Sequence, residues 1–181
     1  MYYVPYVNPY HFHHHHYQHP YYMDFPMHYG NHWGYYQTPM FRKQTEFRDH
    51  GKRPYVVNIN EAAKQNNTYR TAIWTGNHLQ VTLMSLHVGE DIGLEIHPNV
   101  DQFLRIEQGH GIVQMGNKKD NLNFVRQVND DSAIFIPAGT WHNVTNTGNI
   151  PLKLYSIYAP PNHPFGTVHK TKKDAMAAEH H

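Results

Sequence analysis

The chain has 181 residues, enough for one well-packed domain with appendages. It contains no cysteine, which excludes disulfides, thiolate zinc sites and cysteine nucleophiles. The formal net charge of +1 argues neither for nor against an acidic partner, and no apolar run approaches the ~18 residues of a membrane span.

The N-terminus lacks the basic and apolar regions of a secretory signal, so we expect synthesis in the cytoplasm and no membrane partner. Residues 1–41 contain no Lys or Arg and are crowded with Tyr, His and Pro, including consecutive histidines at 13–16. Prolines interrupt regular structure, and aliphatic residues are too few to form a core. We predict a disordered, low-complexity tail followed by a charged linker, together covering residues 1–53.

Several roles are open for this tail. His-rich tracts capture metal ions. Tyrosine rings attract one another, so the tail could also drive self-assembly, which protonation of its histidines would weaken. Nucleic-acid binding is disfavoured because Lys and Arg, which neutralise phosphates, are missing. A variable extension without a role is the remaining alternative. The composition resembles the Tyr/His-rich tails of spore-coat proteins, which implies assembly and a place in the spore coat.

The rest of the chain alternates short apolar strands with turns, as is typical of a β-sandwich or barrel. We predict an all-β barrel at 54–160 and a C-terminal extension at 161–181. The predicted elements are a strand at 54–59, a helix at 61–66 capped by Asn60, strands at 71–75, 78–86, 94–97, 102–107, 112–115, 122–128, 133–136, 141–146 and 152–159, and a helix at 172–179. Thr171 and Asp174 have the spacing of a capping box for the last helix. A small double-stranded β-helix of the jelly-roll type fits this pattern best.

Two segments carry polar residues that strands and corners would direct into one interior. Glu95 and His97 are two residues apart, so on a strand they share a face. Gln102 begins the next strand after a Pro-Asn turn, and His142 follows a Pro-x-Gly corner. Groups of this kind that converge inside a barrel would form a metal site.

These segments resemble the two motifs of the cupin superfamily, Gly-x5-His-x-His-x4-Glu-x6-Gly and Gly-x5-Pro-x-Gly-x2-His-x3-Asn. The residues that match are Gly89, His97, Gly109, Pro137, Gly139, His142 and Asn146. Glu95 stands at the first histidine, Gln102 at the glutamate, and Asp131 at the leading glycine of the second motif. The resemblance covers residues 70 to 160 and implies a cupin barrel, which is often dimeric, so a homodimer is expected.

The resemblance also implies a divalent metal ion held by Glu95, His97, Gln102 and His142, with Glu95 and His97 as catalytic candidates. Two histidines and one carboxylate suit Fe(II), and Mn(II), Zn(II) or Ni(II) could also be accommodated. Gln102 is a neutral, weak ligand, so lower affinity is expected than with the family's glutamate. The alternative is a metal-free polar core in which an imidazolium and a carboxylate satisfy each other.

Two functions remain open. The stretch Glu-x-His-Pro-x-x-Asp-Gln resembles small bacterial cupins related to mannose-6-phosphate isomerase. This resemblance implies a metal-dependent isomerase, or a dioxygenase if the metal is iron, acting on a small molecule. Glu95 and His97 could also exchange protons without a metal. The other function is a structural barrel that the tail assembles into a larger layer.

A few further residues were assigned from their positions. We expect residues 160–169 to pack as an extended segment across the barrel, where His163 and His169 could approach the mouth of the site. On the strand at 102–107, alternation directs Arg105 and Glu107 outward, as a solvated pair. Trp141 alternates away from His142, which predicts a role in packing or in an interface.

Overall fold

The computed structural model describes residues 47–178. The chain divides into a unit at Met1–Phe41, which lies outside the described residues, and a unit at Arg42–His181 that holds the folded domain. The predictions for the tail and for Glu179 also fall outside the described part. No helix among the described residues is both long and apolar enough to cross a membrane.

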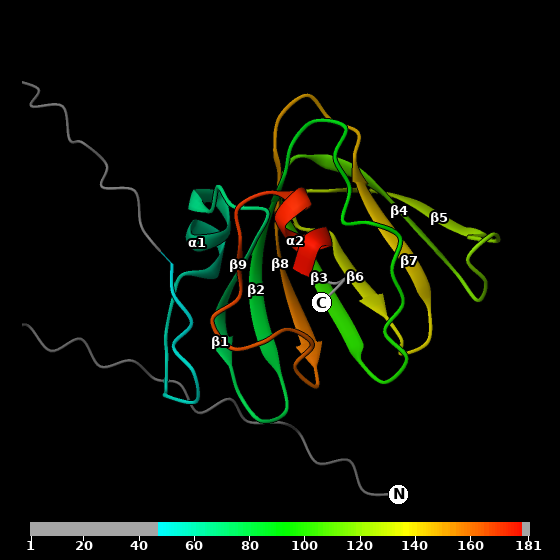
Figure 1. Cartoon of the computed structure of the whole chain (residues 1–181). Coiled ribbons are helices and arrows are strands. Elements are labelled where there is room, and N and C mark those ends of the chain that lie inside the picture. Colours follow the sequence, from blue (N-terminus) through cyan, green and yellow to red (C-terminus); the bar gives the residue numbers. More distant parts are fainter. Residues whose placement is uncertain (1–46, 179–181) are drawn as a thin grey trace, which may run out of the picture. The chain divides into compact units, whose positions relative to one another are not determined.

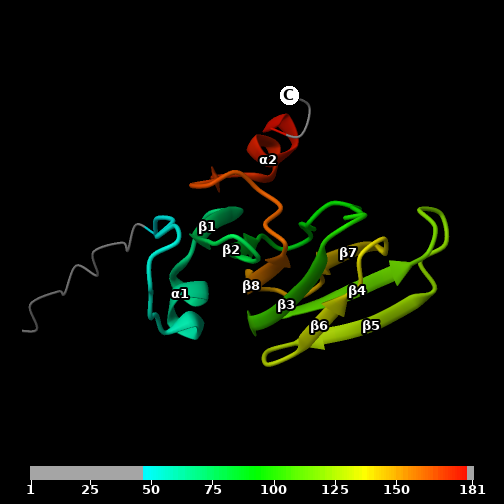
Figure 2. The same ribbon diagram turned by 90° about the horizontal axis from the view of Figure 1, so that it is seen from below.

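Two antiparallel sheets form the domain (Figures 1 and 2). A six-stranded sheet has the order β6-β3-β8-β2-β1-β9, and a three-stranded sheet has the order β5-β4-β7. The elements are α1 (Ile59–Gln65), β1 (Arg70–Thr75), β2 (Gln80–Leu86), β3 (Asp101–Gln108), β4 (His110–Gly116), β5 (Phe124–Asn129), β6 (Ala133–Ile136), β7 (Trp141–Asn146), β8 (Leu152–Ala159), β9 (Val168–His169) and α2 (Lys172–Ala178). The predicted all-β jelly roll with two short helices is confirmed.

The helices lie on different sides of the six-stranded sheet. Ala62 and Ala63 of α1 pack on its outer face, against Ile73 and Leu83, whereas Ala175 of α2 belongs to the core cluster between the sheets. In Figure 2, α1 and α2 accordingly stand apart from each other. The capping box of α2 is present, because Asp174 N–H donates to Thr171 Oγ1 at 3.2 Å and Thr171 N–H donates to Asp174 Oδ2 at 2.8 Å.

Two predicted strands are wrong. Residues 54–58 have no regular structure, and α1 begins at Ile59 because Asn58, rather than Asn60, caps it: Asn58 Oδ1 accepts from Glu61 N–H at 3.2 Å. Residues 94–97 form only an isolated bridge, between Glu95 and His142. A single bridge supplies too few ladder hydrogen bonds for a strand, although it still brings the two segments together.

The interior has an apolar half and a polar half. The apolar half contains inward-facing residues of both sheets, among them Met84, Leu86, Leu104, Val113, Val144 and Leu154. The same strands carry buried polar side chains further along the barrel, namely Gln80, Thr82, Gln102, His142 and Ser156, whereas the buried Arg70 lies opposite Met84. Burial of each large apolar side chain stabilises the fold by about 1.5–3 kcal/mol. This stabilisation offsets the free-energy cost of burying the polar side chains, which need hydrogen-bond partners.

The predicted solvated pair of Arg105 and Glu107 is wrong, because Glu107 has 0% exposure. Glu107 Oε1 accepts from Arg105 Nη1, and Glu107 Oε2 accepts from Asn60 Nδ2 of α1 at 2.5 Å. The β3 strand does direct Glu107 away from the barrel interior, but helix α1 covers that part of the outer face. Strand alternation alone could not reveal this cover.

Two motif positions are explained by backbone conformation. Gly109 has φ 95°, and a Cβ there would lie 3.1 Å from Leu152 Cα and Pro151 O. Asp131, at the position of the family's leading glycine, also adopts a positive φ of 68°. Asn and Asp tolerate this left-handed region better than most residues, and the Asp131 carboxylate lies 2.5 Å from Arg105 Nη2. The substitution therefore preserves the corner.

Asn146, the last residue of the second motif, is a buried structural residue. Its Nδ2 donates to Leu86 O at 3.0 Å and to Ile150 O at 2.9 Å, and its Oδ1 accepts from Gly148 N–H at 2.9 Å. A buried hydrogen bond contributes about 1 kcal/mol, so we expect Asn146→Ala to lower the free energy of unfolding by about 2–3 kcal/mol. Asn146→Asp should cost at least as much, because it places a carboxylate oxygen against two carbonyl oxygens.

Urea denaturation of both variants checks this. Asn149→Ala is the matched control, because Asn149 is exposed in the same turn. An Asn146→Asp variant as stable as the wild type would contradict the assigned donor pattern.

Candidate metal centre

Backbone hydrogen bonds join the two motif segments. Glu95 N–H donates to His142 O at 3.1 Å, and His142 N–H donates to Glu95 O at 3.0 Å. Gly139 N–H, in the Pro-x-Gly corner, donates to His97 O at 2.9 Å. The residues of the first motif are therefore fixed against β7 by main-chain atoms, and their side chains are directed to the same place.

Three side chains meet there. His97 Nε2 and His142 Nε2 each lie 3.3 Å from Glu95 Oε1, and the three donor atoms lie within 4.8 Å of one another. With metal–ligand bonds of about 2.1 Å, neighbouring donors lie about 3.0 Å apart in an octahedron and about 3.4 Å apart in a tetrahedron. The spacing around the Glu95 oxygen therefore suits a divalent ion.

The hydrogen bonding of His142 defines which nitrogen faces the centre. Its Nδ1 lies 2.9 Å from Thr140 O. Since a carbonyl oxygen only accepts, Nδ1 carries the hydrogen, and in a neutral ring Nε2 then presents a lone pair toward Glu95 Oε1. Two acceptors 3.3 Å apart repel each other unless a cation lies between them. That cation is either a metal ion or the proton of an imidazolium.

Glu95 is ionised. Burial by itself would raise the pKa of Glu95, but the His142 and His97 rings, each with a proton or cation between its Nε2 and the carboxylate, together with the charge of Arg70, outweigh burial and hold this pKa well below its ordinary value. A metal ion bound here would therefore not have to displace a proton from the carboxyl group.

Gln102 lies buried on β3 in the polar half of the barrel. Its Nε2 donates to Ser156 Oγ at 3.1 Å, whereas its buried Oε1 accepts no hydrogen bond. A buried amide oxygen without a partner is costly and calls for an explanation, such as an ion or water. Its assignment as the fourth ligand stays a prediction.

A pocket of about 590 Å³ is lined by two of the donors, Glu95 and His97, whereas His142 is fully buried and does not line it. One wall is the segment 160–169, which packs across the barrel as predicted. Gln80 fixes it, because Gln80 Nε2 donates to His163 O at 2.9 Å and His163 N–H donates to Gln80 Oε1 at 3.0 Å. Strand β9 also pairs with β1, and Figure 1 shows it at that edge of the sheet. His163 and His169 both line the pocket.

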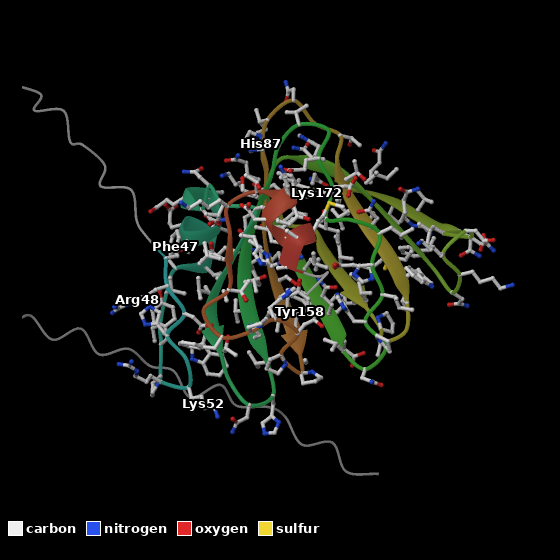
Figure 3. All side chains as sticks on the ribbon, viewed as in Figure 1. Phe47, Arg48, Lys52, His87, Tyr158 and Lys172 are labelled. Atoms are coloured by element: carbon white, nitrogen blue, oxygen red, sulfur yellow. The ribbon has the colours of Figure 1, made fainter. Side chains whose placement is uncertain are left out.

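Rings connect the donors to this wall. Tyr158 of β8, labelled in Figure 3, lies edge-on to His97 at 5.7 Å and to His163 at 4.9 Å between ring centroids. Trp141, which we expected in packing or an interface, lines the pocket, with Lys119 Nζ 5.6 Å from its ring centroid. Strand alternation placed Trp141 opposite His142 but could not show that the pocket extends around that edge.

Sequence reasoning missed Arg70. It is 1% exposed and faces the barrel interior at the first position of β1. Its charge lowers the pKa of Glu95 and, after burial, is the next cause that lowers the pKa of His163. The predicted strand began at residue 71, one residue too late. Two-residue alternation from Ala72 would have assigned Arg70 to the inner face.

The comparisons with known proteins agree with this architecture. A family model described as a cupin domain matches residues 82–158, and the uncharacterized protein YrkC of Bacillus subtilis is 79% identical over 132 residues, 73% of this chain and 71% of that protein. The chain belongs to the cupin superfamily. The uncharacterized protein L612 of Acanthamoeba polyphaga mimivirus is 46% identical over 115 residues, 63% of this cupin and 70% of that protein.

Solved structures give the same result. The crystal structure of BH2720 from Bacillus halodurans is 70% identical, has a TM-score of 0.71, and covers 72% of this cupin and 98% of its own chain. A Klebsiella pneumoniae protein with a double-stranded β-helix domain, at 20% identity and a TM-score of 0.51, covers 65% of this cupin and 98% of that chain. The second likeness concerns the fold alone.

His163 predicts a pH dependence of stability. Burial, followed by the charge of Arg70, lowers the pKa of His163 from 6.5 to about 3. The unfolded chain therefore takes up this proton before the folded chain does, and stability falls as the pH decreases from about 6.5 to about 3, by at most about 1.4 kcal/mol per pH unit. In His163→Asn, the free energy of unfolding should decline less between pH 6.5 and 5, above the range in which Glu95 titrates.

Urea titrations at several pH values, with His78→Asn as the exposed control, measure this difference. Parallel pH profiles for the wild type and His163→Asn would show that His163 is not a buried neutral group.

Proposed function

We propose that this cupin holds one divalent metal ion at Glu95, His97 and His142, with Gln102 as a weak fourth ligand, and binds a small molecule in the adjoining pocket. The observation that supports it most directly is the approach of His142 Nε2 to Glu95 Oε1 at 3.3 Å, with His142 Nδ1–H directed to Thr140 O. A metal ion would resolve this repulsion and would also give Gln102 Oε1 a partner.

Two imidazoles and one carboxylate suit Fe(II), Mn(II), Zn(II) or Ni(II). When bound, such an ion would polarise a ligand oxygen, and iron would add oxygen chemistry. The pocket residues contribute orientation and exclusion of water. The alternative function, a metal-dependent sugar-phosphate isomerase-like enzyme or a dioxygenase-like enzyme, uses the same site.

Glu95 and His97 without a metal are a weaker explanation. A carboxyl group whose pKa is held far below its ordinary value is a poor proton acceptor near neutral pH, because catalytic efficiency follows basicity. This electrostatic setting supports Glu95 as a metal ligand rather than as a general base.

The first prediction concerns metal content. We expect about one ion per chain in the wild type and a clear loss in Glu95→Ala and His97→Ala, because each variant removes one of three charged or imidazole donors. Elemental mass spectrometry measures this. His78→Ala is the matched control, since His78 is an exposed histidine outside both motifs.

The tail must be removed for that measurement, because consecutive histidines at 13–16 would bind ions themselves. The shortened chain should begin at Phe47, because Asp49 Oδ2 accepts from Thr75 Oγ1 at 2.5 Å and from Gly166 N–H at 3.0 Å. A folded, metal-free wild type would favour the imidazolium–carboxylate core and overturn the proposal.

The second prediction tests the fourth ligand. Gln102→Glu restores the carboxylate of the family motif, so we expect tighter metal binding and, without metal, a lower melting temperature from repulsion by Glu95. Gln102→Leu should weaken binding without that repulsion. Calorimetric titration with Zn(II) and thermal unfolding with and without the ion measure both effects. Equal affinities in all three proteins would remove Gln102 from the ligand set.

The predictions for partners rest on sequence alone. A role of the Tyr/His-rich tail in assembly or metal capture, a location in the spore coat, and a homodimer are supported by composition or by the family resemblance, and they stay proposals.

A further inference from the structure

With a metal ion bound, the pocket would carry a net positive charge. Among the described residues that line the pocket, Glu95 is the only carboxylate, whereas Lys119, His97, His163 and His169 are cationic or imidazole groups. Arg70 is buried, and its positive charge already compensates that of Glu95. A divalent ion would therefore add about two positive charges that no lining side chain neutralises.

Lys119 is placed at this site by the hairpin between β4 and β5. Its ammonium lies 5.6 Å from the ring centroid of Trp141, the residue directly before His142, and it lines the pocket. The indole face attracts the cation and so restricts its position. The adjacent Lys118, whose backbone bridges Asn121 across the hairpin turn, does not line the pocket.

The opposite wall offers a further polar contact. His163 Nε2 is buried and has no hydrogen-bond partner, although His163 lines the pocket. A neutral imidazole can donate to or accept from a ligand oxygen without adding charge. Two of the three metal donors, Glu95 and His97, thus face the same space of about 590 Å³ as Lys119 and His163, and this volume suits a small molecule.

We propose that the ligand of this site is a small oxyanion, carrying a carboxylate or a phosphate group, and that Lys119 is the residue that selects its negative charge. This rests on the metal site proposed above, because the bound ion supplies most of the excess positive charge. The oxyanion lies between the ion and the Lys119 ammonium, and charge-assisted hydrogen bonds of this type are about twice as strong as neutral ones.

The experiment uses the same chain beginning at Phe47, loaded with Zn(II) and freed of excess ion, because the histidines at 13–16 would bind Zn(II) and the test anions themselves. Binding of acetate, inorganic phosphate and acetamide is measured by calorimetric titration in the wild type, Lys119→Met, Lys119→Arg and Lys118→Met. Acetate and acetamide have nearly the same shape and differ in charge, while acetate and phosphate distinguish the two sources of an oxyanion. Elemental analysis of every protein establishes that the variants keep the same metal content.

We expect at least one of the two anions to bind, and acetamide not to bind measurably. Lys119→Met should weaken anion binding about tenfold, as expected for loss of one charge-assisted contact, whereas Lys119→Arg and Lys118→Met stay close to the wild type. Lys119 and Lys118 are both exposed, so neither variant should disturb the fold.

Two failures are distinguishable. If the Glu95→Ala and His97→Ala variants bind as much Zn(II) as the wild type, the proposed function is overturned. A wild type with an intact metal site that binds acetamide as tightly as acetate, or that loses no anion affinity in Lys119→Met, overturns the inference about the ligand alone.

Discussion

The reciprocal main-chain hydrogen bonds between Glu95 and His142 are the interaction on which the rest of the site depends. They join a segment without regular strand structure to β7, and the neighbouring bond from Ile92 N–H to Val144 O extends the same contact. Because a narrow antiparallel pair directs its two side chains to one side, the carboxylate and the imidazole meet without any contribution from their own attraction. His97, two residues on, reaches the same point.

Burying the polar side chains of the site costs folding free energy, and the apolar core of the barrel offsets this cost. Arg70, Gln102 and His142 are removed from water, Glu95 is only 17% exposed, and buried polar groups destabilise a fold unless they have partners. Gln102 Oε1 and His163 Nε2 have none. Unsatisfied atoms of this kind concentrate where a protein binds something, and here both lie in the half of the barrel that holds the candidate metal centre.

Much of the fold follows from local sequence, and the errors have physical causes. Strands β6, β7 and β8 have the predicted bounds, because alternation and flanking turns agree there. The Val-Val-Asn-Ile stretch at 56–59 has strand propensity, but the Asn58 cap and the apolar sheet face favour helix α1. Glu107 required knowledge of what α1 covers. For the site, the motif spacing identified the three residues that meet. Strand alternation could also have found Arg70, whereas the places of Lys119 and Trp141 at the pocket depend on how the β4–β5 hairpin and β7 lie in three dimensions.

One wall of the pocket comes from a different segment of the sequence than the candidate metal ligands. Residues 160–169 follow the last long strand as one continuous stretch, and Gln80 and β1 hold this stretch by main-chain hydrogen bonds that do not depend on most of its side chains. Most side chains of residues 160–169 can therefore be substituted without disturbing either motif. A change confined to residues 160–169 would alter the shape and polarity of the pocket and leave Glu95, His97 and His142 in place.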